Sequence, residues 1–185
     1  MVAAGWSLST RAARWAARFY GRHVPLVLGL SLVPTVQRFL VVHYDVPAAV
    51  AVGSEILVAG VRVLLVVLVV RLLARELTGE HGLGGRAALR RLSTAIDARR
   101  GAFWFQWIVL GAAFVVCDVL PNAAVAAWVP DGARDVVTAT MVAVKNPTVI
   151  AFTVLWIVGI GRTLIVEQTD ADEIAAAPDE PAGRR

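Results

Sequence analysis

The most apolar stretch of the chain, "SEILVAGVRVLLVVLVVRLL", runs from Ser54 to Leu73 and carries two ionisable side chains, Glu55 and Arg62, ahead of Arg71 near its end. Glu55 and Arg62 are seven residues apart. On a helix they are separated by roughly 700°, so they share a face and lie about 10 Å apart along the axis. A charge at the centre of a membrane span costs about 2.5–3.5 kcal/mol, and the surrounding Leu, Ile and Val residues barely offset two such costs. The two charges therefore need polar neighbours on other helices.

Arg38 and Asp118 are the candidate neighbours. The link "HYDVP" (43–47) is so short that the apolar runs on either side must form an antiparallel hairpin. That hairpin brings Arg38 to within about 4 Å of the depth of Glu55. Because ionisable residues inside a membrane are functional candidates, we expect a polar pathway or an anion-binding site formed by Arg38, Glu55, Arg62 and Asp118. The alternative is a structural ion pair that fixes the helix register, with Arg38 and Asp118 reaching to the outer interface.

The sequence contains no residue set that indicates catalysis. Cys117 is the only cysteine, which excludes an internal disulfide and a cysteine metal cluster. The three histidines match no metal-ligand spacing, and "GEHGLGG" (79–85) lacks the Gly-Lys-Ser/Thr of a phosphate loop. We therefore expect a protein that is not an enzyme, with no catalytic residues, no metal and no cofactor. A lipid-modifying enzyme remains a third possibility, without residues to assign to it.

Composition places these residues in a membrane. The chain is 58% hydrophobic and 17% charged, with a mean hydropathy of +0.69. A soluble domain has about 45–50% apolar and about 25% charged residues. Four apolar runs are long enough to span a bilayer, at about 24–42, 48–73, 103–120 and 147–166. These features predict an all-α integral membrane protein with a four-span domain over 24–166. The first run is too long, and its basic lead too extended, for a cleaved signal peptide.

Basic residues predict the orientation. Fourteen Arg or Lys residues lie on the side that holds the N-terminus, the link between the second and third spans counted from Arg71, and the C-terminal end, against two, Arg134 and Lys145, on the other side. By the positive-inside rule both termini are cytoplasmic. Seventeen of the eighteen basic residues are arginine. Together with the many Ala and Val residues, this favours a GC-rich bacterial genome and hence a bacterial cytoplasmic membrane. Because the arginines flank apolar runs, we expect no nucleic-acid partner.

Two basic amphipathic helices are predicted on the cytoplasmic side. One lies in the N-terminal segment 1–23 and the other covers 86–99 within the link. Each places arginines on one face above apolar or small residues, the pattern of a helix in the headgroup plane that contacts anionic lipid. The expected headgroup contacts are Arg11, Arg14, Arg18, Arg22, Arg86, Arg90 and Arg91. The repeated order of basic helix, span, link and returning span also suggests an internal duplication in parallel orientation.

Two segments outside the spans have their own predictions. Residues 133–145 are expected to form a short helix on the outer surface; a helix that dips into the membrane or extends the fourth span is left open. The acidic tail 167–185 has few large apolar residues and is predicted to be disordered. Its carboxylates are complementary to the basic cytoplasmic link, onto which the tail would fold back.

A small-residue face on the second span indicates how the protein would associate. Ala49, Gly53 and Gly60 lie opposite Glu55 and Arg62, and small residues allow close helix packing in membranes. We expect a non-enzymatic accessory or scaffold subunit of a bacterial membrane assembly, with a membrane-protein partner or a homo-oligomer. The alternative is a small oligomeric transporter or channel that uses the polar site of Arg38, Glu55 and Arg62.

Overall fold

The computed structural model describes residues 2–44 and 46–176, and every regular element in these ranges is a helix. Two of the elements, η1 and η2, are single π-helical turns. In chain order the elements are α1 Val2–Arg22, α2 Val24–His43, α3 Ala48–His81, α4 Gly85–Ala98, α5 Arg100–Phe114, η1 Val115–Val119, α6 Leu120–Trp128, α7 Asp131–Lys145, η2 Asn146–Ile150 and α8 Ala151–Ala176. The all-α prediction is confirmed for these residues.

Four helical segments are long and apolar enough to cross a membrane, which agrees with the four predicted spans. They cover Val24–Val41, Ala48–Gly79, Arg100–Trp128 and Asp131–Asp172. The second runs past its predicted end at residue 73. The last two are longer than predicted because α5, η1 and α6 form one continuous helical segment, and α7, η2 and α8 form another. Helix α3 ends in the glycine-rich stretch 79–85. There, Gly82 adopts a left-handed conformation with φ of 61°, which favours glycine and stops the helix.

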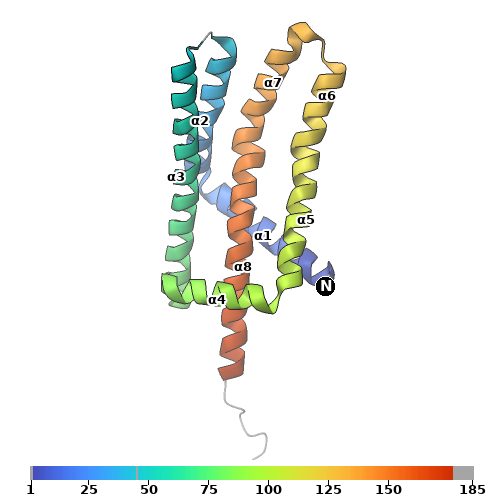
Figure 1. Cartoon of the computed structure of the whole chain (residues 1–185). Coiled ribbons are helices and arrows are strands. Elements are labelled where there is room, and N and C mark those ends of the chain that lie inside the picture. The colour runs from blue at the N-terminus through green and yellow to red at the C-terminus, as the bar shows by residue number, and fades with distance from the viewer. Residues whose placement is uncertain (1, 45, 177–185) are drawn as a thin grey trace, which may run out of the picture.

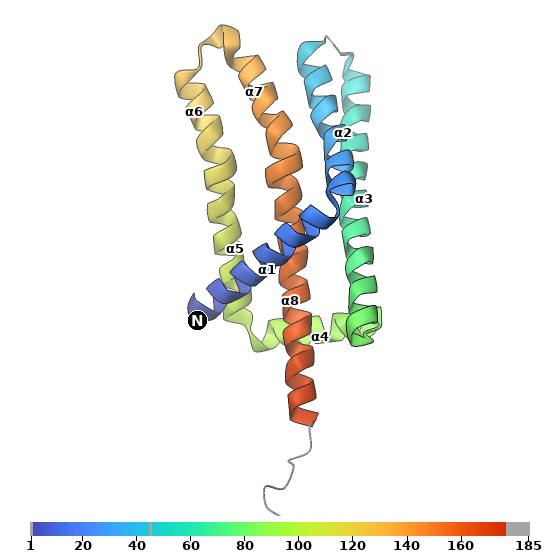
Figure 2. The same cartoon turned by 180° about the vertical axis from the view of Figure 1, so that it is seen from behind.

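The long segments form two antiparallel hairpins whose turns lie at the same end of the molecule (Figure 1). One hairpin is α2–α3; the other consists of α5–η1–α6 and α7–η2–α8, with α8 in the middle of the bundle. Helix α4 runs across the opposite end, and α1 crosses the bundle obliquely on the reverse side (Figure 2). Each half thus has one crossing helix followed by one hairpin. The order matches that of the suggested duplication, which itself stays a prediction.

The expectation of a surface helix at 133–145 is wrong. Helix α7 forms the first part of the fourth long segment, and the backbone remains right-handed helical at Asn146, with φ of −57° and ψ of −56°. Pro147 does not break the segment because it lies in the π-helical turn η2, and such a turn accommodates a residue without an N–H donor. Pro121 follows η1 in the same way.

The predicted disorder of the tail is wrong for residues 167–176. These residues continue α8, and Glu167 forms ion pairs with Arg11 of α1, at 2.6 Å, and with Arg99. The carboxylate of Glu167 holds α8 against α1 and against the C-terminal end of α4. These ion pairs stabilise helix in a segment that has few large apolar residues. Residues 177–185 lie outside the described residues.

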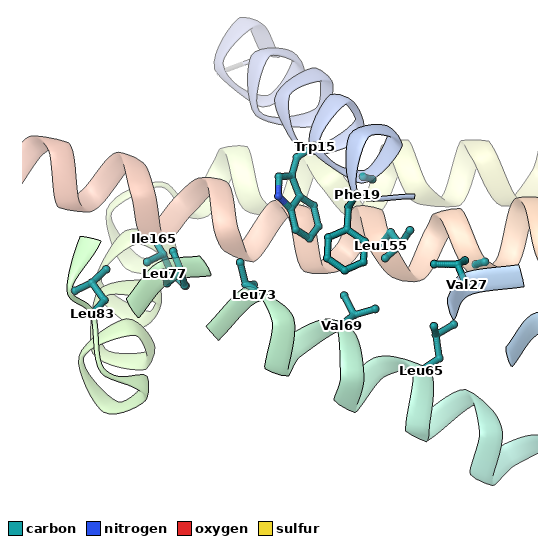
Figure 3. Packing of buried hydrophobic residues seen from close by; sticks show 12 residues of the cluster. Trp15, Phe19, Val27, Leu65, Val69, Leu73, Leu77, Leu83, Leu155 and Ile165 are labelled. Carbon is teal, nitrogen blue, oxygen red and sulfur yellow. The ribbon is translucent and has the colours of Figure 1, made fainter. Parts of the chain in front are cut away.

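A buried core joins α1, α3 and α8 (Figure 3). Trp15 and Phe19 of α1 point into it beside Leu155 of α8 and Val69 of α3. The apolar face of α1 therefore packs against protein. The arginines of α1 remain exposed. That α1 is an amphipathic helix in the headgroup plane stays a prediction.

Candidate functional site

All four ionisable residues singled out in the spans line one cavity of about 280 Å³ between the two hairpins. Helices α2 and α3 supply one wall, and η1, α7 and η2 supply the other. The residues that line it are Pro34, Gln37, Arg38, Glu55, Val58, Arg62, Asp118, Val142, Lys145, Asn146 and Ile150. Every charged residue among them lies within one of the four membrane-length segments. We call this space the polar cavity.

The α2–α3 wall is positioned by the tight hairpin. Gln37 of α2 lies opposite the first turns of α3, where its Nε2 donates hydrogen bonds to Ser54 Oγ at 2.9 Å and to Glu55 Oε1 at 3.2 Å. Glu55 and Arg62 face the same cavity, as their spacing predicts. However, among the described residues Glu55 makes no ion pair with an arginine, so its polar partner is the amide of Gln37.

Across the cavity, Asp118 forms an ion pair with Lys145: the lysine Nζ lies 2.9 Å from Oδ1 of Asp118. The position of Lys145 differs from the sequence prediction, which assigned this residue to the outer link and not to a span. It is buried, with 9% of its surface exposed, while 39% of the Asp118 side chain is exposed. The missed signal is the apolar run "VVTATMVAV" directly before Lys145. That run lengthens the fourth span and places the lysine well inside it.

Two facing π-helical turns place this ion pair. Asp118 lies in η1 of the third long segment, and Lys145 directly precedes η2 in the fourth. A π-turn widens the helix by one residue and changes the direction of nearby side chains, and such turns are frequent at functional sites. Here the two turns direct one carboxylate and one ammonium group toward the same point between the hairpins.

The polar cavity has an excess of positive charge. It holds three cationic side chains, Arg38, Arg62 and Lys145, and two carboxylates. Lys145 is paired with Asp118, whereas neither Arg38 nor Arg62 makes an ion pair among the described residues. A guanidinium group offers a planar set of donors that matches a carboxylate or phosphate. The arrangement is therefore suited to an anion. The described residues hold no group of three candidate metal ligands.

The arginines predicted to contact headgroups fall into two sets. Arg11 pairs with Glu167, and Arg91 donates a hydrogen bond to Thr169 at 2.6 Å and lies 3.6 Å from Asp172. These two guanidinium groups hold the end of α8. The other five are exposed and make no ion pair within the described part of the chain: Arg14, Arg18, Arg22, Arg86 and Arg90. Lipid contact by this second set stays a prediction.

The small-residue face of α3 is uncovered. Ala49, Gly53 and Gly60 are exposed, and a Cβ atom built on either glycine would meet nothing within 4 Å. The chain's own described helices therefore leave this face open. A comparison with protein families, curated protein sequences and solved structures gives no match to this chain. Its function therefore has to be argued from the polar cavity and the open face.

Proposed function

We propose that the chain is a non-enzymatic, multi-pass protein of the bacterial cytoplasmic membrane that binds an anion in the polar cavity. Both termini are cytoplasmic in this proposal, and the binding step serves transport by an oligomer, because four spans enclose little pore. The observation that supports it is the pair of guanidinium groups, Arg38 and Arg62, which have no carboxylate partner among the described residues and lie within membrane-length segments. Since each such charge is costly inside a bilayer, a bound anion supplies the missing compensation.

The test is stabilisation of the purified protein by an inorganic anion. Phosphate and sulfate, compared with chloride at equal ionic strength, should raise the thermal unfolding midpoint. Ligand at one hundred times Kd contributes about 2.7 kcal/mol. Arg62→Gln should remove this effect. Arg71→Gln is the matched control, because Arg71 is also exposed on α3 but lies outside the cavity. Equal stabilisation of both variants, or none in the unmodified protein, would contradict the proposal.

A second candidate function, an accessory or scaffold subunit, is favoured by the open face of Ala49, Gly53 and Gly60. Native mass determination after gentle extraction from the source membrane tests it. A stoichiometric second protein that is lost in Gly60→Leu but retained in Gly111→Leu would support this role, since Gly111 is equally open but lies on α5. A homo-oligomer would favour the transporter. A monomer would contradict both the accessory-subunit role and transport by an oligomer.

A further inference from the structure

A second, larger hollow adjoins the polar cavity. It has a volume of about 860 Å³ and lies between α1, α5 and the η2–α8 segment; we call it the apolar crevice. Leu110 and Phe114 of α5 line one side, and Phe152 and Trp156 of α8 line the other. Phe114 is 59% exposed, so the crevice is open to the surroundings of the bundle at this side chain. In a bilayer those surroundings are lipid chains.

The hydroxyl groups in the apolar crevice are already satisfied. The Tyr20 hydroxyl donates a hydrogen bond to the Pro147 carbonyl at 2.9 Å. Thr148 and Thr153 donate to carbonyl oxygens of their own helix, at 2.6 and 2.8 Å. None of these three groups has to be solvated by water, so the crevice suits a hydrocarbon occupant.

The two hollows meet at the ion pair. Asp118, Lys145 and Ile150 line both the polar cavity and the apolar crevice. On one side of this shared wall lie Arg38 and Arg62, and on the other side lie apolar side chains. A ligand at this wall therefore meets cationic groups at one end and hydrocarbon at the other.

Helix α1 lines one side of the crevice. Ala17 and Tyr20 line the crevice, while Arg14, Arg18 and Arg22 line a separate polar hollow on the other flank of α1. From Lys145 to Trp156 the crevice follows eleven residues of helix, or about 16 Å. One half of the hydrocarbon core of a bilayer is about 15 Å thick. The crevice is therefore long enough for most of one acyl chain.

We propose that the anion in the polar cavity is the headgroup of an anionic phospholipid, and that one of its acyl chains lies in the apolar crevice. This inference rests on the proposed anion site and names its ligand class. Charge complementarity supports it, because the guanidinium groups of Arg38 and Arg62 recognise the phosphate. The open side at Phe114 admits a ligand that arrives within the membrane.

The first experiment measures lipid retention by native mass spectrometry. The protein is equilibrated with equal amounts of phosphatidylglycerol and phosphatidylcholine that carry identical chains. We expect at least tenfold preferential retention of phosphatidylglycerol. Ala113→Trp, which fills the crevice, should reduce this retention tenfold, whereas Ala112→Trp should not, because the exposed Ala112 lies beside Ala113 but does not line the crevice. Arg62→Gln should also lose the preference. Equal retention of the two lipids would overturn the inference.

Inorganic phosphate separates this inference from the proposed function. Ala113→Trp should keep phosphate stabilisation while it loses lipid, and Arg62→Gln should lose both. Phosphate stabilisation without lipid preference would overturn the lipid inference and leave the anion site intact. If the unmodified protein shows neither phosphate stabilisation nor lipid preference, both the lipid inference and the proposed anion site are wrong. If Ala113→Trp does not fold, Ala113→Leu replaces it.

A second experiment uses fluorescence. Phosphatidylglycerol with brominated chains should quench the fluorescence of Trp156, so Trp156→Phe should lose part of the total quenching. An unchanged total would contradict the inference.

Discussion

The ammonium group of Lys145 and the carboxylate of Asp118 lie 2.9 Å apart, deep within two membrane-length segments. An isolated charge at this depth would be costly, and removal of one partner of a desolvated pair leaves the other uncompensated. The pair therefore stabilises the hairpin of the third and fourth long segments. It also forms the wall that the polar cavity and the apolar crevice share.

Lys145→Met and Asp118→Asn should each lower the free energy of unfolding, because each leaves one charge without its partner. The double variant should recover part of the loss, which gives a coupling energy of about 0.5–3 kcal/mol in a double-mutant cycle. Thermal unfolding in a fixed detergent measures all four proteins. Purely additive losses would show that the two groups do not stabilise one another.

The same cycle on Glu55 and Arg62 should give the opposite result. The two residues share a face, but Glu55 accepts a hydrogen bond from Gln37, and Arg62 has no carboxylate partner in the described ranges 2–44 and 46–176. The effects of Glu55→Gln and Arg62→Leu on the unfolding midpoint should therefore add within about 0.5 kcal/mol. Recovery of stability in the double variant would restore the alternative of a structural ion pair. The spacing predicted the shared face, whereas pairing depends on a neighbouring helix.

Among the elements, α1 and α8 approach closely at Gly159. A Cβ atom on residue 159 of α8 would lie 2.8 Å from the carbonyl oxygen of Ala12 and 2.9 Å from Cε3 of Trp15. Only glycine fits there, because the nearest obstacle is backbone. This contact places the aromatic face of α1 in the core seen in Figure 3 and leaves its arginines outside.

Gly159→Ala should destabilise the protein by roughly 1–3 kcal/mol, because the methyl group overpacks the crossing of α1 and α8. Gly161→Ala, two residues further along α8, is the matched control: its Cβ atom would meet nothing within 4 Å, and alanine favours helix by up to about 1 kcal/mol. Thermal unfolding compares the two, and faster hydrogen exchange in residues 2–22 of Gly159→Ala would locate the defect. Equal stability of both variants would contradict the close crossing.

Sequence periodicity and length were sufficient for the existence of the four long segments, but proline was a misleading boundary signal. The predicted spans 103–120 and 147–166 stop before Pro121 and start at Pro147, yet each proline is accommodated beside or within a π-helical turn. Single-sequence rules treat proline as a helix breaker because its ring clashes with the preceding turn. They give no means of finding a π-turn that relieves the clash. Because the fourth span was predicted to start at Pro147, Lys145 was placed outside the span and left out of the candidate site.

At the scale of the whole molecule, charge has two separate roles. Arg11, Arg91 and Arg99 use carboxylates or a hydroxyl of α8 as partners and so hold the crossing helices at one end of the bundle. The remaining exposed arginines at that end stay available for the membrane surface. Composition predicted which end is basic. Composition did not predict which arginines form ion pairs or hydrogen bonds with α8, because that depends on the position of α8 relative to α1 and α4.

The distribution of these arginines also predicts how the molecule sits in the bilayer, with the α4 end cytoplasmic and the hairpin turns outside. Gly84 and Gly132 lie at opposite ends, and neither would bring a Cβ atom within 4 Å of another group. In a Cys117→Ser background, Gly132→Cys should react with an impermeant maleimide in intact cells. Gly84→Cys should react only after permeabilisation, and the reverse pattern would invert the topology. The residues of the polar cavity lie closer to the hairpin turns than to α4. The predicted orientation would therefore place the cavity in the outer half of the bilayer, and the outer leaflet would be the source of the bound lipid.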